Sequence, residues 1–540
     1  RTIYEAPYGQ YRQELLDPAS GMHRFAPDVV LLCTHHGELA LPAHAPAPEA
    51  AVGAEAARWT APWRAAGAAV IQHNFAAPYE QALGHLASAL PGSRAAMTQA
   101  VNAALGAAAG ASGGAVSIVD CERLSALFGK GRWFDPRYWH LSKQGVALDA
   151  LPLLARHTAA VLAARLGLSR KCLVLDLDNT LWGGVIGEDG LGGIRLGGTP
   201  EGEAFVAFQE QLLALKDKGV ILAVVSKNNE ADAREPFEHH PEMRLRLGDV
   251  ASFVASWEPK SDGIRRVAAQ LGIGLDAIAF ADDNPAERQI VRELLPEVDV
   301  LPFPAEPALY GRALADYLGF ETSAFTAEDA SRTAQYRARA EGARLAADAG
   351  SIEDFYRGLR MQALVAPFDA VQLPRIAQLV GKSNQFNLTT RRHGLPELRA
   401  LMDDPRCIHL SLRLRDRFAD HGLVGVIIAV GDDAGEALDV DTWLMSCRVL
   451  GRTADAEMLA HLSRRAAARG YRWITGTYRP TPKNGMVREL YAKYGFERAG
   501  ADGDGATRWR YDLGTRGPIR NEYIEAVETW RDSDDAAPAA

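Results

Sequence analysis

The order of hydrophobic and polar positions predicts strands that alternate with helices along most of the chain. Up to about residue 165, short apolar runs at 29–33 and 115–119 alternate with long alanine-rich stretches of helical character. From 171 to about 305 the alternation is sharper. The apolar runs of this part lie at 172–177, 220–225, 277–281 and 298–301. Strands that are apolar on both faces are typical of a parallel sheet with helices on each side.

The C-terminal part of the chain has a different pattern. Residues 326–360 are charged and helical, which is typical of a connector. Beyond them, helices at about 453–469 and 484–494 are interleaved with further apolar runs. These runs lie at 407–414, 424–430, 438–445 and 473–478. We therefore predict an α/β multidomain protein whose last domain is mixed α+β.

Length, charge and cysteine content narrow the class of protein. A chain of 540 residues is too long for one hydrophobic core. A net charge of -9 creates no field that would attract nucleic acid, and no apolar run approaches the roughly 20 residues needed to span a bilayer. The five cysteines have neither disulfide-framework nor zinc-site spacing. We expect a cytoplasmic protein with no nucleic-acid or membrane partner.

Two carboxylates directly follow the apolar run at 172–177, in the sequence Asp176-Leu-Asp-Asn-Thr180. At the carboxyl end of a strand, an Mg²⁺ ion can neutralise such a pair together with a phosphoryl group. Asp176 would attack phosphorus, and Asp178 would protonate the leaving oxygen and then activate water. Thr180 would contact the phosphate.

Three further elements with matching chemistry follow in order. Ser226 closes the next strand and is followed by Lys227 and Asn228, a group suited to holding phosphate oxygens. Lys260 opens a helix and would offset the negative charge. Asp282 and Asp283 end the following strand and would complete the metal shell with Asp176 and Asp178; of the two, Asp282 is favoured. Each residue alone is more often a helix cap or a solvated charge, but four elements in register favour a phosphotransfer site.

The segment 175–190, Leu-Asp-Leu-Asp-Asn-Thr-Leu-Trp-Gly-Gly-Val-Ile-Gly-Glu-Asp-Gly, resembles the FkbH-like branch of the haloacid dehalogenase (HAD) superfamily. The segment 282–288 resembles the same branch. The resemblance implies a phosphotransferase with an aspartyl nucleophile and Mg²⁺ as cofactor. Only about twenty residues separate the motif from a helix near 201, which is too few for a large cap domain, so the site should stay open to a bulky partner.

Two C-terminal segments resemble the GNAT acyltransferases. Segment 444–453 contains an Arg-x-x-Gly turn like the one that cradles pyrophosphate in that family, although Thr453 stands where Gly or Ala is usual. Segment 481–496 resembles the helix that GNAT folds place beside the pantetheine arm. The resemblance implies pantetheine binding by Arg448, Gly451, Arg452, Asn484 and Tyr491.

FkbH-like proteins join these two domains, and the resemblance covers about 170 to 515. It implies transfer of the glyceryl group of 1,3-bisphosphoglycerate to the phosphopantetheine of an acyl carrier protein, with loss of phosphate, in polyketide biosynthesis. One alternative is a HAD-type phosphatase of a small phosphorylated metabolite with a structural GNAT-like domain. A non-catalytic docking protein is the other, and the set of phosphotransfer residues weighs against it.

A thioester relay needs a thiol and a base. We predict Cys447 as the thiol, His421 as the base, and Asp416 or Asp420 as the group that orients the base. A small core cysteine beside a capping histidine is an equally common arrangement. The competing thiols are Cys33, which precedes His35 and His36, and Cys407, whereas Cys172 should be packed core.

The N-terminal part resembles the SGNH hydrolases in its segment 139–145, and the segment 72–75 resembles their Asn block. Arg137 stands where an Asp is expected before His140, and there is no Gly-Asp-Ser nucleophile. We expect a degenerate, non-hydrolytic domain in which His140 is a core or surface residue.

The predicted boundaries follow from these assignments. They are 1–165 for the degenerate SGNH-like domain, 166–325 for the HAD-like domain with a minimal cap, 326–360 for the connector, 361–515 for the GNAT-like domain, and 516–540 for a tail. The tail is rich in Asp, Ala and Pro, which is typical of a linker, and we expect the chain to be part of a larger polypeptide.

Overall fold

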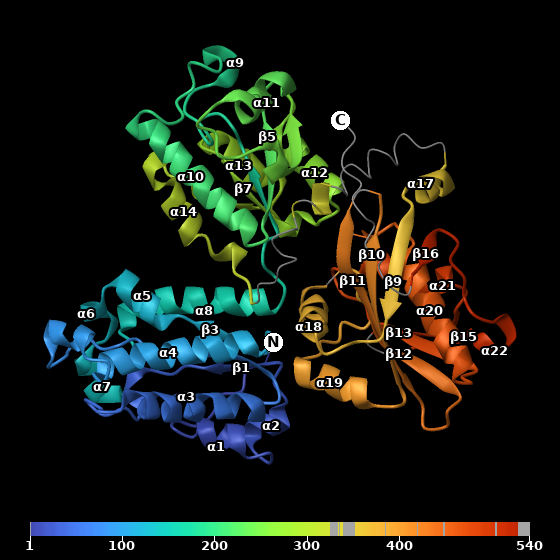
Figure 1. The fold of residues 1–540 in the computed structure, drawn as a ribbon, viewed down its shortest axis with the longest axis horizontal. Coiled ribbons are helices and arrows are strands. Elements are labelled where there is room, and N and C mark those ends of the chain that lie inside the picture. The colour runs from blue at the N-terminus through green and yellow to red at the C-terminus, as the bar shows by residue number, and fades with distance from the viewer. Residues whose placement is uncertain are drawn as a thin grey trace. The chain divides into compact units, whose positions relative to one another are not determined.

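The computed structural model describes most of the chain (Figure 1). The described residues are 2–323, 333, 335–337, 351–383, 385–417, 419–446, 449–502 and 505–527. They form two compact units, one made mainly of residues up to Leu166 and the other mainly of residues from Gly167 onward. Most of the predicted connector lies outside the described residues. No helix among them is long and apolar enough to cross a membrane.

The first unit is built on a small parallel sheet of order β1-β2-β3. Its strands are β1 (Val29–Leu32), β2 (Ala69–His73) and β3 (Val116–Val119). The helices are α1 (Tyr11–Leu16), α2 (Gly21–Phe25), α3 (Pro48–Ala65), α4 (Arg94–Ala111), α5 (Cys121–Phe128), α6 (Lys130–Trp133), α7 (Pro136–Ser142) and α8 (Leu151–Arg165). Helix α4 shows why the alanine-rich stretches are helical: Ser93 caps its first turn, and Met97, Val101 and Leu105 recur at helical spacing and are fully buried.

The second unit begins with a five-stranded parallel sheet of order β6-β5-β4-β7-β8. Its strands are β4 (Cys172–Leu175), β5 (Ile221–Ser226), β6 (Val250–Ala255), β7 (Ile278–Ala281) and β8 (Asp299–Val300). The helices are α9 (Ile186–Asp189), α10 (Pro200–Asp217), α11 (Glu230–His239), α12 (Lys260–Leu271), α13 (Pro285–Leu294) and α14 (Tyr310–Asp316). Every residue of β4 is fully buried, because the strand is central and both faces of the sheet are covered.

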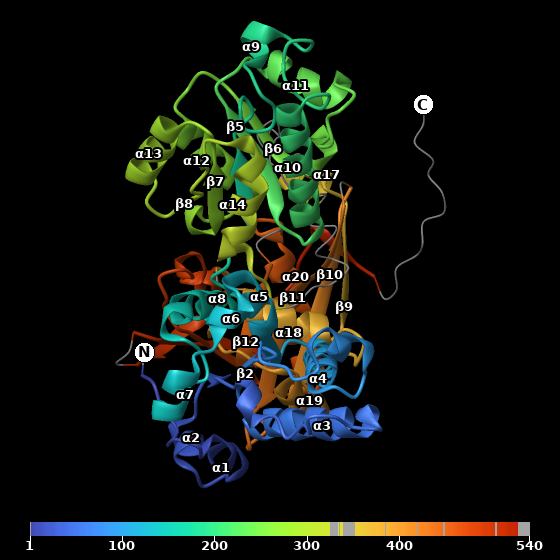
Figure 2. The ribbon, with the colours of Figure 1, turned by 90° about the vertical axis from the view of Figure 1, so that its left-hand side faces the viewer.

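Alternate residues of β4 enter two different cores. Leu173 and Leu175 pack with α10 and α14 on one face, whereas Cys172 and Val174 pack with α12 and α13 on the other. Helices on both sides of this sheet are visible in two views (Figure 1 and Figure 2). The layered arrangement leaves only the strand ends open to a ligand, which is where the predicted phosphotransfer motifs fall.

The C-terminal part forms a mixed sheet of order β14-β15-β13-β12-β11-β10-β9-β16. Its strands are β9 (Met361–Ala366), β10 (Cys407–Arg415), β11 (Asp420–Gly431), β12 (Ala437–Met445), β13 (Trp473–Tyr478), β14 (Glu497–Ala501), β15 (Thr507–Asp512) and β16 (Ile524–Ala526). Its described helices are α17 (Ile352–Gly358), α18 (Leu373–Lys382), α19 (Leu395–Asp403), α20 (Ala454–Ala468), α21 (Leu490–Lys493) and α22 (Leu513–Arg516). The multidomain α/β fold class is thereby confirmed.

The sheet extends past the predicted start of the tail at residue 516. Strand β16 pairs in parallel with β9, and the Val527 N–H donates to the Ala363 carbonyl at 2.9 Å. This strand was not predicted from the sequence, because three residues are too few for a periodic pattern.

The parallel strands β12 and β13 pair only from Ala437 opposite Trp473 to Val440 opposite Gly476. Beyond this point another part of the chain, residues 386–388, lies between them, and we call it the inserted segment. The Leu388 N–H donates to the Trp443 carbonyl at 3.2 Å, and the Leu388 carbonyl accepts from the Arg479 N–H at 2.8 Å. The Phe386 carbonyl accepts from the Met445 N–H at 3.1 Å. The inserted segment therefore satisfies backbone groups that the diverging strands leave open.

Candidate functional site

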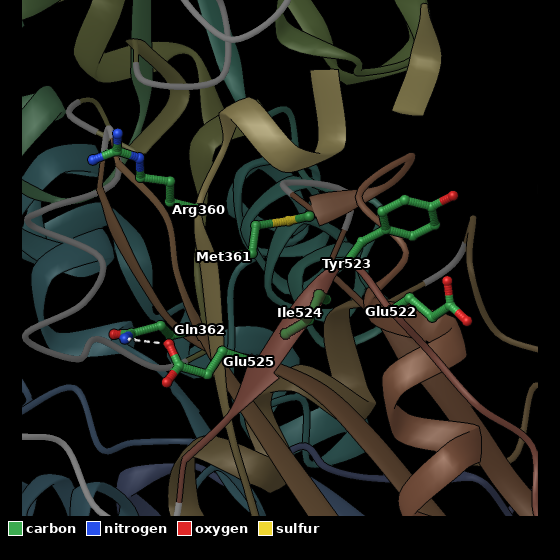
Figure 3. A pocket seen from close by; sticks show the side chains of 7 residues that line it. All are labelled: Arg360, Met361, Gln362, Glu522, Tyr523, Ile524 and Glu525. Carbon is green, nitrogen blue, oxygen red and sulfur yellow. Dashed lines mark hydrogen bonds between the residues drawn. The ribbon is translucent and has the colours of Figure 1, made fainter. Parts of the chain in front are cut away.

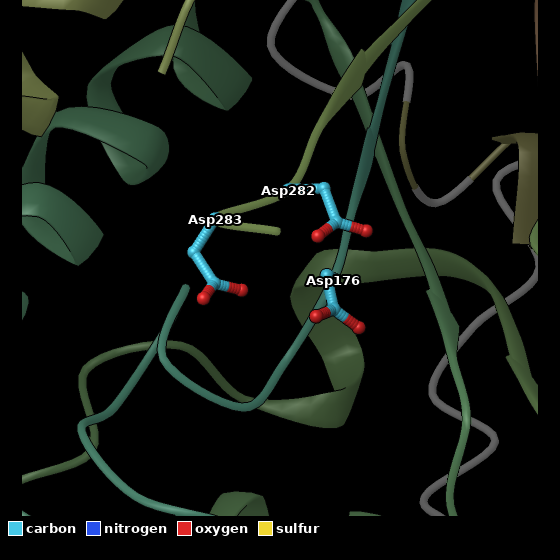
Figure 4. Close-up of side chains that lie close together, drawn as sticks. All are labelled: Asp176, Asp282 and Asp283. Atoms are coloured by element: carbon cyan, nitrogen blue, oxygen red, sulfur yellow. The ribbon is translucent and has the colours of Figure 1, made fainter. Parts of the chain in front are cut away.

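Three carboxylates lie together at the carboxyl edge of the parallel sheet. Asp176 follows β4, and Asp282 and Asp283 follow the neighbouring strand β7. The two strand ends are tied by a hydrogen bond of 3.0 Å from the Asp176 N–H to the Ala281 carbonyl. One ligand oxygen from each of the three carboxylates lies within 4.8 Å of the others, and Figure 4 shows the side chains converging. Such a group of hard oxygen ligands is what Mg²⁺ prefers.

A single lysine compensates part of this charge. Lys260 is buried at the start of α12, and its Nζ lies 2.9 Å from Asp176 Oδ1 and 2.6 Å from Asp282 Oδ2. The other oxygen of Asp282 accepts from the Asn284 N–H at 2.8 Å. Three carboxylates and one ammonium leave net negative charge in a buried place, which a divalent cation would balance.

The electrostatics of the group agree with this reading. Burial raises the pKa of Asp176 to about 6, with repulsion from Asp282 acting in the same direction and attraction by Lys260 opposing both. Burial also raises the pKa values of Asp282 and Asp283. Although burial opposes it, attraction by Asp176 and Asp282 raises the pKa of Lys260. The lysine is therefore charged at neutral pH.

The side chain of Asp178 lies outside this group, although the sequence predicted it as a fourth metal ligand. Its Oδ1 accepts from the Trp182 indole N–H at 2.9 Å and from the Ile186 N–H at 3.0 Å. Its Oδ2 accepts from Asn228 Nδ2 at 2.8 Å. Two carboxylates that are two residues apart thus have different surroundings, as different chemical roles require.

The predicted phosphate-binding residues also line this edge. Ser226 is buried at the end of β5 and its Oγ accepts from Asn228 Nδ2 at 3.1 Å. Thr180 Oγ1 accepts from the Asp283 N–H at 3.2 Å and so links the loops after β4 and β7. Lys227 instead forms an ion pair of 2.5 Å with Glu287 on α13. The Lys227 ammonium is therefore already paired with a carboxylate, and phosphate binding by Lys227 stays a prediction.

Residues that the sequence analysis did not single out also support the site. Trp182 was read only as part of a family motif, yet its indole holds Asp178. Arg288 Nη1 donates to the carbonyls of Asp282 and Asp283 at 2.6 and 2.7 Å. Contacts between a side chain and a backbone carbonyl have no signal in a single sequence.

The segment after the motif is compact, as its length predicted. Helix α9 has only four residues, and the chain returns to α10 through a backbone pairing between Gly183 and Arg195. Within the described residues 176–200 there is no cap domain.

A second buried polar cluster lies in the C-terminal part. His421 Nε2 lies 2.8 Å from Asp416 Oδ2, and Arg452 Nη1 lies 2.7 Å from the same histidine nitrogen and also pairs with Asp416. The His421 and Asp416 side chains are fully buried. Of the two candidate orienting residues, the structure brings Asp416 to His421, whereas Asp420 forms an ion pair of 2.8 Å with Arg415. Arg452 was predicted to bind pantetheine but here contacts the His421–Asp416 pair.

The candidate thiols have different environments. Cys447 and Arg448 lie outside the described residues. Burial raises the pKa of Cys407 to about 11. Cys172 is fully buried at the start of β4, as expected, and Cys33 is exposed after β1. A high thiol pKa makes Cys407 a poor nucleophile at neutral pH.

Two of the predicted pantetheine ligands serve the core of the domain. Asn484 is fully buried, and its Nδ2 donates to the Asn387 carbonyl at 2.9 Å and to the Arg479 carbonyl at 2.8 Å. Tyr491 is also fully buried and packs against Trp443 at a ring-centroid distance of 5.9 Å. Asn484 thus holds the inserted segment, and pantetheine binding by either residue stays a prediction. Gly451, at φ +75°, is exposed in the turn before α20.

In the N-terminal unit, an arginine stands where the SGNH resemblance leads one to expect an aspartate before His140. Arg137 forms an ion pair of 2.7 Å with Asp135, and His140 is an exposed residue on α7. His35 lies edge-on to Trp139 with ring centroids 4.9 Å apart. The non-hydrolytic role of this unit stays a prediction.

A surface depression at the sheet edge is unrelated to these clusters. It lies between β9 and the chain around β16, and its polar lining includes Arg360, Glu522 and Glu525 (Figure 3). Gln362 Nε2 donates to Glu525 Oε2 at 2.9 Å across it. None of the predicted catalytic, phosphate-binding or metal-binding residues lines this depression.

Comparison with known proteins decides the family. Residues 2–163 match the family model of the FkbH N-terminal domain. A crystal structure of the N-terminal part of the protein BF1531 from Bacteroides fragilis, which contains a phosphatase domain complexed with Mg, is 35% identical. The match covers 60% of this chain and 87% of that chain, with a TM-score of 0.56. The chain belongs to the FkbH-like family. The resemblance expected from the motif at 175–190 is thereby confirmed.

Other matches to this FkbH-like chain are more distant. The ribosomal-protein-S18-alanine N-acetyltransferase from Escherichia coli is 12% identical, and the match covers 28% of this chain and 94% of that chain, with a TM-score of 0.23. The GNAT domain of S. lividans PAT is 15% identical, with coverages of 28% and 89% and a TM-score of 0.23. No curated protein matches the sequence. The match to the Mg-bound phosphatase-domain structure, and not these distant ones, shows that the FkbH-like chain carries a phosphatase domain of the HAD class.

Proposed function

We propose that this FkbH-like protein is a Mg²⁺-dependent enzyme that takes the glyceryl group of 1,3-bisphosphoglycerate, removes phosphate, and loads the glyceryl group as a thioester on the phosphopantetheine of an acyl carrier protein. The observation that carries the proposal is the convergence of Asp176, Asp282 and Asp283, with Lys260 paired to the first two and Asp178 held apart from them. This is a nucleophile, a cation site and a separate proton carrier on one sheet edge.

The roles at the phosphotransfer site follow from the contacts. An Asp176 carboxylate oxygen attacks the phosphorus of the phosphate on carbon 3 of the glyceryl unit, the bond from phosphorus to the oxygen on that carbon breaks, and Asp178 protonates the leaving oxygen. Water then attacks the phosphoaspartate and loses its proton to Asp178, which releases phosphate. The Ser226 hydroxyl and the Lys260 ammonium hold phosphate oxygens. Asp176, Asp282 and Asp283 would hold Mg²⁺, which supplies charge neutralisation at the phosphoryl group.

Asp283 is the stronger of the two candidate ligands from β7, although Asp282 was favoured from the sequence. Both oxygens of Asp282 accept hydrogen bonds, from Lys260 and from the Asn284 N–H. The carboxylate of Asp283 lies in the same group without an ion pair to Lys260. A carboxylate that is not already paired with an ammonium can coordinate a cation at lower cost.

The acyl step is assigned to the His421 cluster. The Cys447 thiol loses its proton to His421, its sulfur bonds to the glyceryl carbonyl carbon, and the bond from that carbon to the acyl-phosphate oxygen breaks. The carrier thiol then displaces Cys447 in the same way. The support is the buried contact of His421 with Asp416, which would orient the base and stabilise its protonated form.

One experiment separates this function from a plain phosphatase. The full chain is incubated with Mg²⁺, 1,3-bisphosphoglycerate and a holo carrier protein, and the carrier is weighed by intact mass spectrometry. The expected result is a glyceryl adduct on the carrier together with phosphate release. Release of phosphate with no gain of mass on the carrier would favour a phosphatase of small phosphorylated metabolites.

Two variants locate the chemistry. Asp176→Asn should abolish release of the phosphate on carbon 3 and leave a phosphoglyceryl adduct, while Cys447→Ala should abolish the glyceryl adduct on the enzyme itself. Survival of that adduct in Cys447→Ala would move the acyl-carrying thiol to another cysteine.

A further inference from the structure

Trp182 is the one aromatic side chain that donates a hydrogen bond to a carboxylate of the candidate phosphotransfer site, within the part of the chain that the structure describes. The indole N–H is 2.9 Å from Asp178 Oδ1 and the ring is fully buried. We propose that Trp182 is a positioning residue that fixes the Asp178 carboxylate beside the nucleophile. The proposal rests on the phosphotransfer function proposed above.

The ring itself has little freedom to move. It packs edge-on against Phe237, with centroids 6.1 Å apart and planes at 80°, inside the core between the sheet and α10. On either side of Trp182 the backbone is also held: Gln209 Nε2 donates to the Leu181 carbonyl at 2.8 Å, and Gly183 pairs with Arg195. The position of the indole N–H is therefore set by the core and not by a mobile side chain.

The carboxylate is held from two directions. Trp182 and the Ile186 N–H both donate to Oδ1, while Asn228 donates to Oδ2 from the loop after β5. These donors fix the plane of the Asp178 carboxylate and keep its side chain outside the group of Asp176, Asp282 and Asp283. Without the indole donor, Oδ1 would keep only the Ile186 N–H, and the plane of the carboxylate would no longer be fixed.

The kinetic test uses the full chain with Mg²⁺ and p-nitrophenyl phosphate as the probe. Trp182→Phe keeps the apolar ring and removes the N–H. It should lower kcat about tenfold, the effect expected when one hydrogen bond to a charged group is lost. The KM for the probe and the Mg²⁺ concentration for half-maximal activity should change less than about twofold, because the substitution removes no contact to the probe or to the cation.

A double variant separates positioning from a general loss of packing. In an Asp178→Ala background, Trp182→Phe should have no further effect on kcat, because the group that it positions is gone. Losses that multiply would overturn the proposal. The matched control is Phe208→Leu, an equally buried aromatic of the same core, which should lower stability but leave kcat unchanged while the chain is folded.

A spectroscopic measurement keeps the test independent of turnover. The chain has ten tryptophans, and their ¹⁵N-labelled indole N–H signals are compared between wild type and Asp178→Asn. One signal should shift strongly, and it should be the one that is lost in Trp182→Phe. An unchanged set of indole signals would overturn the proposal. If wild type turns over neither p-nitrophenyl phosphate nor 1,3-bisphosphoglycerate, the proposed function fails, and the indole signals still decide the contact.

Discussion

At the residue scale, the buried Lys260 of the phosphotransfer site stabilises the folded chain in addition to its proposed role in holding phosphate. Replacing Lys260 by Met leaves Asp176 and Asp282 buried beside each other without their ammonium partner. We expect the free energy of unfolding without Mg²⁺ to fall by about 3 kcal/mol, the cost of breaking a buried ion pair. Urea denaturation measures it. The control is Lys227→Met, which breaks a more exposed ion pair with Glu287 and should cost less than about 1 kcal/mol.

The same carboxylates make Mg²⁺ binding depend on pH. The pKa of Asp176 is raised to about 6 in the folded chain, above its unfolded value, so without the metal the ionised form destabilises the fold as pH rises from about 4 to 6. At pH 5 a bound proton competes with the cation, and at pH 7 it does not. Added MgCl₂ should therefore raise the melting temperature more at pH 7 than at pH 5. Equal shifts at the two pH values would contradict the assignment of the cation site.

Much of the phosphotransfer site could be predicted from single residues, because each one directly follows an apolar run or opens a helix. Asp176, Ser226, Lys260 and Asp282 could be placed on one edge because carboxyl ends of parallel strands meet there. The side-chain direction of Asp178 could not be predicted. It depends on Trp182 and Asn228, which approach from different loops, and a pattern of apolar positions contains no information on which donor meets which acceptor.

At the scale of elements, the inserted segment depends on one buried amide. Asn484 donates to the carbonyls of Asn387 and Arg479. Replacing Asn484 by Ala leaves both carbonyls without these donors, and we expect the free energy of unfolding to fall by about 2 to 3 kcal/mol. Hydrogen exchange at the backbone amides of Leu388, Met445 and Arg479 should accelerate together, because their bonds form one connected group.

The control for Asn484→Ala is Gln362→Ala, which removes an exposed side-chain contact to Glu525 and should leave exchange at these amides unchanged. A loss of carrier loading in Asn484→Ala with unchanged stability and exchange would instead support the predicted pantetheine role.

The strands and helices that bury a continuous or periodic apolar face could be predicted; the inserted segment could not. Strand β5 coincides with the apolar run at 220–225 almost residue for residue. The inserted segment has no such period, since Phe386 and Leu388 flank a fully buried Asn387. Its position is decided by the backbone groups that β12 and β13 leave open, a property of the assembled sheet.

At the scale of the whole molecule, the C-terminal sheet is closed by a strand from the predicted tail. Deleting the chain from Gly517 onward removes β16 and its pairing with β9. We expect the melting temperature of the C-terminal part to fall, because β9 becomes an open edge and the buried Ile524 is lost. Differential scanning calorimetry measures the change. A chain that ends after Val527 retains every described contact of β16 and is the control; equal melting temperatures for the two truncations would contradict a stabilising role.

The inserted segment would lower the affinity of any ligand that binds at the diverging ends of β12 and β13. Trp443, Met445 and Arg479 already have backbone partners supplied by the chain itself. A ligand that bonded to the same backbone groups would compete with the inserted segment, which belongs to the same chain and is therefore always present at high effective concentration. Its apparent affinity would equal its intrinsic affinity multiplied by the fraction of molecules in which residues 386–388 are displaced. Variants that weaken the backbone bonds of this segment should then bind such a ligand more tightly, while their own free energy of unfolding falls.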